Sequence, residues 1–246
     1  MEQFSSYAKD PWGRLFRTID VMMKLSFGTP LQSARQQRLL ANMHRRVRGT
    51  TDAGAAYSAL DADLQLWVWA TLVDTALMIY ERLRTELSAE ELAHFYEEQK
   101  LVAYGCGVPV GGCPDTWEDF RSYVARVIAE DLQVTRSARA VATAAMVPPL
   151  PGPAATVAAV PQRLVTVGLL PPTLRQQYGF QWTNADQRNL RHFFQVARAA
   201  NSLTPAPVRY LNAELTLRRS KPLKVAWLQR RGGEMTTKRL EAAGLG

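Results

Sequence analysis

The chain has 246 residues, of which 47% are hydrophobic and 21% are charged. These proportions are those of an ordinary globular protein and exclude wholesale disorder, while two cysteines are too few for a disulfide-rich secreted scaffold. We therefore expect a cytoplasmic protein whose core is large enough to fold without disulfide bonds or structural metals.

The net charge of +8 is unevenly distributed along the chain. From residue 218 onward there are eight Lys and Arg against two Glu, which gives +6, whereas residues 1–217 carry 22 basic and 20 acidic side chains, which gives +2. The sequence thus predicts one multi-helix domain over 1–217 and a basic, disordered tail over 218–246. A basic tail is weak support for a nucleic-acid-binding fold, and no specific nucleic-acid partner is expected.

The hydrophobic periodicity is helical almost throughout and no alternating strand pattern stands out, which predicts an all-α fold. Residues 50–59 are expected to form a polar turn, and the helix after them is expected to be central and buried nearly all round. Helix starts are marked by capping sequences at Ser88, Thr116 and Thr183. In chain order, we expect helices at 14–25, 31–48, 61 or 63 to about 87, 88 to about 105 and 116 to about 130, then two arms around the prolines at 148–153. A short apolar segment is expected at 161–170, followed by helices at 171–179, from 183 onward and at 208–219.

Two apolar stretches invite comparison with a membrane span, which needs about twenty apolar residues. Leu66–Tyr80 has fifteen residues and contains Asp74, so a buried core helix is the better interpretation. Residues 140–160 carry no charge, but their prolines divide them into pieces too short to span. Two buried arms are expected there, and peripheral membrane contact through this segment stays open.

The three histidines differ in their surroundings. His94 lies beside glutamates in an acidic helix and His192 lies between Arg191 and Phe193, so both are expected to be exposed or structural. His44 shares an apolar helical stripe with Leu40, Met43 and Val47, and five arginines lie near it in the sequence. A histidine in such a place is usually a hydrogen-bonded core residue. An apolar helical crevice with one imidazole and nearby guanidinium groups is also what haem requires, because the imidazole ligates iron and the guanidinium groups pair with the propionates.

Other chemistry-bearing residues have ordinary structural interpretations. Asp74 lies within an apolar helix and needs a partner, for which an Arg of another helix is expected; a structural ion pair and a catalytic acid are both open. Trp67 and Trp69 are expected to fill the core. Cys106 and Cys113 are separated by six residues and are expected to be packed thiols rather than zinc ligands.

Three sequence segments together resemble a known family. These are Asp10-Pro-Trp-Gly-Arg-Leu-Phe-Arg-Thr18, Met43-His-Arg-Arg-Val-Arg-Gly-Thr50 and Leu66-Trp-Val-Trp-Ala-Thr-Leu-Val-Asp74. They are similar to the MpaB-like oxygenase family, which includes the catalytic domain of latex-clearing proteins (rubber oxygenases). The resemblance covers roughly residues 10–215.

The resemblance implies a globin-like helical core that binds haem b, with His44 as the proximal iron ligand. It places Arg14, Arg17 and Thr18 on the distal side, facing the oxygen site. Arg17 stands where some rubber oxygenases have a lysine that caps the iron. Because arginine stays protonated and cannot readily coordinate, an open or water-bound distal site follows.

The resemblance also implies which residues surround the cofactor. Arg45 and Arg48, with Arg46, are candidates for pairing with the propionates, although helical spacing cannot turn all three inward. Trp69 and Asp74 lie in the Leu66–Asp74 segment, which the resemblance places beside the haem. Trp69 stands where the family usually has histidine.

The function predicted from the sequence is a haem-dependent oxygenase that uses dioxygen and an apolar, isoprenoid or lipid-like small molecule. The first alternative is a non-catalytic haem or lipid carrier or sensor of the same fold. The second is a basic helical nucleic-acid-binding protein.

Overall fold

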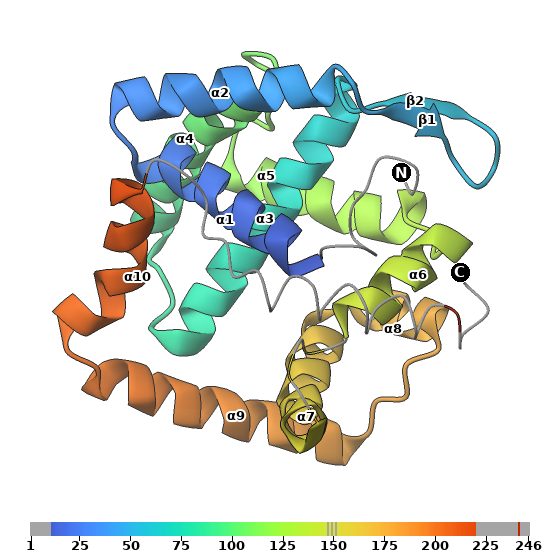
Figure 1. Ribbon diagram of the computed structural model, residues 1–246, viewed down its shortest axis with the longest axis vertical. Helices are drawn as coiled ribbons and strands as arrows, with labels where there is room; N and C mark the ends of the chain where they lie inside the picture. The colour runs from blue at the N-terminus through green and yellow to red at the C-terminus, as the bar shows by residue number, and fades with distance from the viewer. Residues whose placement is uncertain (1–10, 147, 149, 151, 220–240, 242–246) are drawn as a thin grey trace.

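The computed structural model describes residues 11–146, 148, 150, 152–219 and 241, so most of the expected basic tail lies outside the described residues. The described part is all-α, with ten α-helices, one π-helical turn and one short hairpin (Figure 1). The elements are α1 (Pro11–Phe27), α2 (Pro30–His44), β1 (Arg48–Thr50), β2 (Ala56–Ser58), α3 (Ala62–Leu83), α4 (Ala89–Cys106), α5 (Trp117–Arg126), the π-helical turn Val127–Asp131, α6 (Arg136–Ala145), α7 (Gly152–Leu169), α8 (Pro172–Tyr178), α9 (Asn184–Leu203) and α10 (Ala206–Arg218).

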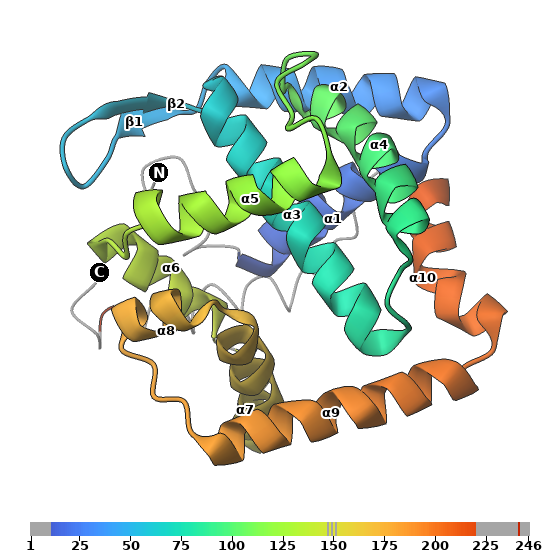
Figure 2. The same cartoon turned by 180° about the vertical axis from the view of Figure 1, so that it is seen from behind.

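Helix α3 is the centre of the fold and contacts α4, α5 and α9 (Figure 2). By length and composition it is the one helix of the described residues that could cross a membrane, with a mean hydropathy of 1.2. Its packing against three other helices identifies it as the core helix expected from the sequence. The expectation that it is buried nearly all round is wrong, because Leu64 and Val68 are 40% and 54% exposed.

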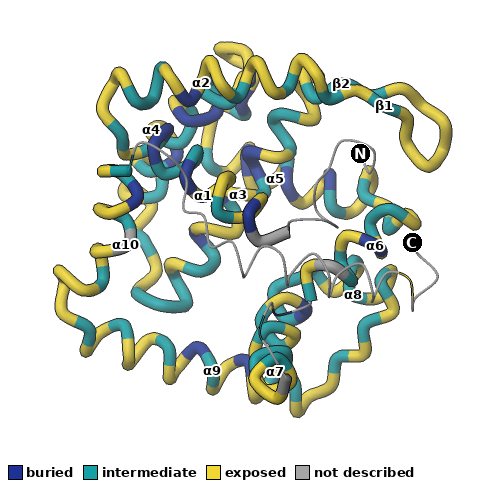
Figure 3. The backbone as a smooth tube through the Cα atoms, viewed as in Figure 1, coloured by how far each residue is buried: buried dark blue, intermediate teal, exposed yellow. Residues whose placement is uncertain are grey.

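The hydrophobic core forms where α3, α4 and α5 meet, and buried backbone is concentrated there and on α1 (Figure 3). Its centre is a set of aromatic rings, in which Trp69 of α3 lies 5.6 Å from Phe120 of α5 and 6.2 Å from Tyr96 of α4 between ring centroids. Such tilted and edge-to-face pairs add to the free energy gained from burial alone.

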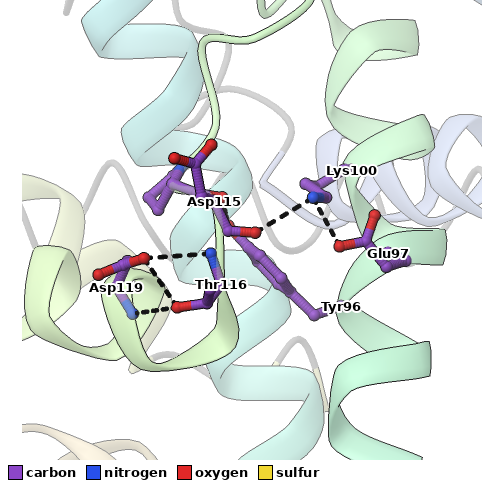
Figure 4. Close-up of polar contacts among 7 residues, drawn as sticks. Tyr96, Glu97, Lys100, Asp115, Thr116 and Asp119 are labelled. Carbon is purple, nitrogen blue, oxygen red and sulfur yellow. Dashed lines mark hydrogen bonds and ion pairs between the residues drawn. The ribbon is translucent and has the colours of Figure 1, made fainter.

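The loop between α4 and α5 is fastened to α4 by polar contacts (Figure 4). The Tyr96 hydroxyl donates to the Pro114 carbonyl at 2.7 Å, and Lys100 Nζ donates to the Asp115 carbonyl at 3.3 Å. Lys100 also pairs with Glu97 at 2.7 Å. The next residue, Thr116, is the N-cap of α5, so these bonds fix where that helix begins.

Two expected helices have different bounds in the structure. Helix α2 ends at His44 rather than Arg48, and a hairpin pairs Arg48 with Ser58 and Thr50 with Ala56. Gly49 is required in this hairpin, because a Cβ there would lie 2.8 Å from the Tyr57 hydroxyl. The segment expected to be a polar turn is therefore partly strand. Helical periodicity does not reveal this, because the strand forms by pairing residues 48–50 with residues 56–58.

Helix α7 also departs from the expectation of separate pieces around 161. It runs without a break from Gly152 to Leu169 and contains Pro161. The helical arms expected on both sides of the proline-rich segment are present as α6 and α7. Their expected burial is not found throughout, because Val157 and Val160 of α7 are 73% and 69% exposed.

Candidate functional site

His44 is the last residue of α2 and is half-buried. Burial lowers the pKa of its imidazole below the ordinary value of 6.5, so the ring is neutral at neutral pH. The neutral ring is the form that ligates a metal. The expected apolar stripe is only partly correct, because Met43 is 55% exposed. The buried residue of α2 is the polar Gln36.

Gln65, in the first turn of α3, is the side chain that contacts His44. Its Nε2 lies 3.5 Å from His44 Nδ1 and donates to the Ala59 carbonyl at 3.0 Å. In this orientation the amide nitrogen can only donate, so Nδ1 faces a donor. Ligation of a metal through Nε2 needs the ring proton on Nδ1, and a half-turn of the Gln65 amide would present its oxygen to that N–H and give up the bond to Ala59.

Gly107 leaves the space that the Gln65 amide occupies. It is the left-handed C-cap of α4, with φ 109°, and a Cβ there would lie 2.8 Å from Gln65 Oε1. Gln65 was not among the site residues predicted from the sequence. A glutamine near a helix start carries no local pattern that would single it out.

The other two histidines are not in comparable places. The His94 side chain is 78% exposed and lies 3.4 Å from Glu98, as the acidic surroundings predict, and His192 is exposed. The described residues contain no group of three or more His, Cys, Asp or Glu side chains that could hold a metal ion. A haem iron takes one axial imidazole from the protein, and His44 is a half-buried imidazole that could supply it.

Arg14, Arg17 and Thr18 lie on the exposed face of α1. Thr18 Oγ1 donates to the Arg14 carbonyl at 3.0 Å, which leaves its oxygen lone pairs available as acceptors. Helices α1 and α2 contact each other and diverge from the turn at residues 28–29 (Figure 1), and Arg14 lies in the first turn of α1 while His44 ends α2. The structure thus places both groups on neighbouring helices.

Arg45, Arg46 and Arg48 follow His44 and are all exposed. Arg45 bonds the side chain of Asn42. Arg46 lines a surface hollow of about 400 Å³ together with Leu39, Met43 and two other residues, and His44 does not belong to that lining. Pairing of Arg45 and Arg48 with a propionate thus stays a prediction.

Trp69 and Asp74 have protein partners that account for them. Trp69 is 1% exposed and its indole N–H donates to the Gln99 carbonyl at 3.1 Å, which confirms that it fills the core. Asp74 pairs with Arg121 of α5 at 2.6 Å, which confirms that an arginine of another helix is its partner. Their role beside a cofactor stays a prediction.

An apolar face of α3 is left uncovered by the described residues. Leu64, Val68 and Leu72 recur at four-residue spacing and are each at least 37% exposed. Leu15 and Ile19 of α1 are exposed to a similar degree. A row of exposed apolar side chains on the central helix is a candidate binding surface for an apolar ligand.

Comparisons with known proteins identify the family to which the chain is similar. Residues 1–199 match the family described as "ER-bound oxygenase mpaB/B'/Rubber oxygenase, catalytic domain". Two uncharacterized proteins, from Mycobacterium bovis and Mycobacterium tuberculosis, are each 30% identical over 200 residues, which is 80% of this chain and 77% of theirs. No solved structure gives a significant match.

Proposed function

Because the chain belongs to the mpaB and rubber oxygenase catalytic-domain family, we propose that it is a haem b-dependent oxygenase acting on an apolar, isoprenoid or lipid-like substrate. The observation that carries the proposal is His44, a half-buried imidazole whose pKa is lowered by burial and whose Nδ1 faces the Gln65 amide at 3.5 Å. We place the protein in the cytoplasm.

The cofactor, when bound, supplies the dioxygen chemistry, and the chain supplies binding and positioning. His44 would hold the iron through Nε2, and Gln65, with its amide turned so that Oε1 accepts from Nδ1–H, would fix the ring plane. The guanidinium groups of Arg14 and Arg17 would stabilise negative charge near the oxygen site without coordinating the metal.

The substrate class follows from the uncovered apolar face. Leu64, Val68 and Leu72 of α3, with Leu15 and Ile19 of α1, offer a surface without charge along which a hydrocarbon chain can lie. Along α3, these residues lead away from Gln65, the residue that contacts His44.

The test is the absorption spectrum of the protein reconstituted with haemin. We expect a Soret band that His44→Ala abolishes, whereas His192→Ala, which removes an exposed imidazole, retains it. Equal haem binding by the His44→Ala variant would contradict the assignment of the axial ligand.

Oxygen uptake distinguishes the oxygenase from a carrier. We expect the reduced, haem-loaded protein to consume dioxygen in the presence of an unsaturated isoprenoid such as squalene, and Arg14→Gln to slow this consumption without loss of haem. A protein that binds haem through His44 and consumes no dioxygen with any unsaturated lipid would instead be a haem or lipid carrier.

A further inference from the structure

A hollow of about 240 Å³ lies between the C-terminal end of α3 and α9. Three of its lining residues are arginines: Arg82 from the last turn of α3, and Arg191 and Arg198 from α9. Two glutamines of the same α9 face, Gln187 and Gln195, add amide groups. No acidic side chain lines the hollow.

The arginines have donors to spare. Arg82 donates to the Met78 carbonyl at 3.1 Å and Arg198 donates to the Glu81 carbonyl at 2.9 Å, so each uses part of a guanidinium group that carries five N–H bonds. Among the described residues none of the three forms an ion pair with a carboxylate. The hollow therefore carries three positive charges and, among the described residues, no carboxylate that pairs with them, although water screens the exposed Arg191 and Arg198.

Capping of α3 explains only part of this arrangement. Carbonyls at a helix C-terminus attract cations, and the bonds of Arg82 and Arg198 are of that kind. Arg191 lies about two turns before Arg198 on α9, and among the residues that the structure describes it makes no such bond. The cap therefore does not account for Arg191.

The apolar floor of the hollow strengthens the attraction between its arginines and an anion. Leu190 and Phe194 form this floor and are 4% and 9% exposed. The Arg82 guanidinium carbon lies 5.5 Å from the centre of the Phe194 ring, which holds the guanidinium group at the wall of the hollow. An apolar floor lowers the local dielectric constant and so makes attraction to an anion stronger than in open water.

We propose that this hollow binds the phosphate group of a ligand. Three guanidinium groups match the charge of a phosphate monoester, which approaches −2 at neutral pH, better than that of a single carboxylate. The site is distinct from the candidate haem site, because Gln65 and Arg82 lie at opposite ends of α3, about 25 Å apart at 1.5 Å per residue. The proposal does not depend on the proposed oxygenase function.

The test is calorimetric titration of the full chain with inorganic phosphate and with glycerol 3-phosphate, at constant ionic strength in chloride. We expect both to bind, and Arg191→Gln to weaken binding about tenfold, the loss typical of one charge-assisted hydrogen bond. Arg188→Gln is the matched control, because Arg188 is exposed on the same helix and does not line the hollow. It should change the affinity less than about twofold.

A second arm identifies the source of the phosphate. Phosphatidylcholine vesicles with and without phosphatidic acid are tested for binding to the same three proteins. Binding only to phosphatidic acid vesicles, lost in Arg191→Gln, assigns the site to a lipid headgroup, whereas binding of the free monoester alone assigns it to a soluble ligand. The proposal is overturned if neither inorganic phosphate nor glycerol 3-phosphate binds in the presence of chloride. It is also overturned if Arg188→Gln weakens binding as much as Arg191→Gln.

Discussion

Asp20 and Lys24 form the most deeply buried ion pair among the described residues. They lie one turn apart on α1, with Nζ at 2.7 Å and 2.9 Å from the two carboxylate oxygens, and they are 5% and 3% exposed. In sequence the pair is indistinguishable from a solvated i, i+4 pair, so it could not be predicted as buried. Its burial results from the packing of α1 against α2, α4 and α10.

We expect removal of one partner to destabilise the protein strongly. Lys24→Met leaves a buried carboxylate without its counter-charge and should lower the free energy of unfolding by about 3–5 kcal/mol. The double variant Asp20→Leu with Lys24→Met should recover most of this loss, because no buried charge remains. Urea denaturation of the single and double variants measures both values, and equal stability of the two would refute the explanation.

Individual residues of the candidate site differ in how far they could be predicted from the sequence. His44 was predictable because its residue type and its neighbours in the chain are informative. The arginine partner of Asp74 was predictable as a type, because a carboxylate in an apolar helix needs a cation, but its identity as Arg121 depends on how α3 and α5 pack. Gln65 was not predictable, because its contact with His44 joins two helices across a hairpin.

At the scale of elements, helix starts were predicted best. Ser88, Thr116 and Thr183 each accept a bond from the backbone three residues on, and the acid at that position bonds back, as their local pattern predicts. The end of α2 was missed because the hairpin that follows it is stabilised by pairing between segments 48–50 and 56–58. Local signals thus fix where helices begin, and tertiary pairing decides where this one ends.

We expect the cap of α4 to contribute measurably to stability. Ser88→Ala removes the acceptor for the Glu91 N–H and should lower the free energy of unfolding by about 1 kcal/mol at pH 7. Thr75→Ala, at an exposed position inside α3, is the control and should be neutral or slightly stabilising. An equal loss in both variants would show that the cap contributes nothing.

The cap also has a definite pH dependence. Hydrogen bonds from the Ser88 backbone and side chain lower the pKa of Glu91 below its ordinary value of 4.5. A lowered pKa means that the stabilisation is complete above 4.5 and is lost as the pH falls through the lowered value. Glu91→Gln keeps an acceptor oxygen without the charge. As the pH is lowered below 4.5, the unfolding temperature of this variant should therefore decrease less steeply than that of the parent protein.

At the scale of the whole molecule, the fold class was predictable because helical periodicity extends over most of the chain. The uncovered faces of α3 and α7 were not, because an apolar helix in isolation gives no indication of which side its neighbours leave open. The charge distribution is likewise a property of the whole chain, with most of the excess beyond residue 217.

We expect non-specific nucleic-acid binding to reside in the basic tail. Truncation after Arg219 removes six lysines and arginines and should abolish binding to duplex DNA, whereas the full chain should bind with a log–log salt slope no steeper than about −5. Electrophoretic mobility shifts at several salt concentrations measure both. Undiminished binding by the truncated protein would place the interaction on the arginine-rich end of α2 instead.

Gly107 links the end of one helix to the candidate iron ligand on another. Any side chain at position 107 would displace the Gln65 amide, and the imidazole of His44 would lose its neighbour. Positions 65 and 107 should therefore vary together among descendants of a common ancestor: where glycine is replaced, glutamine should also be replaced by a shorter residue. A relative that breaks this correlation must orient its histidine by other means.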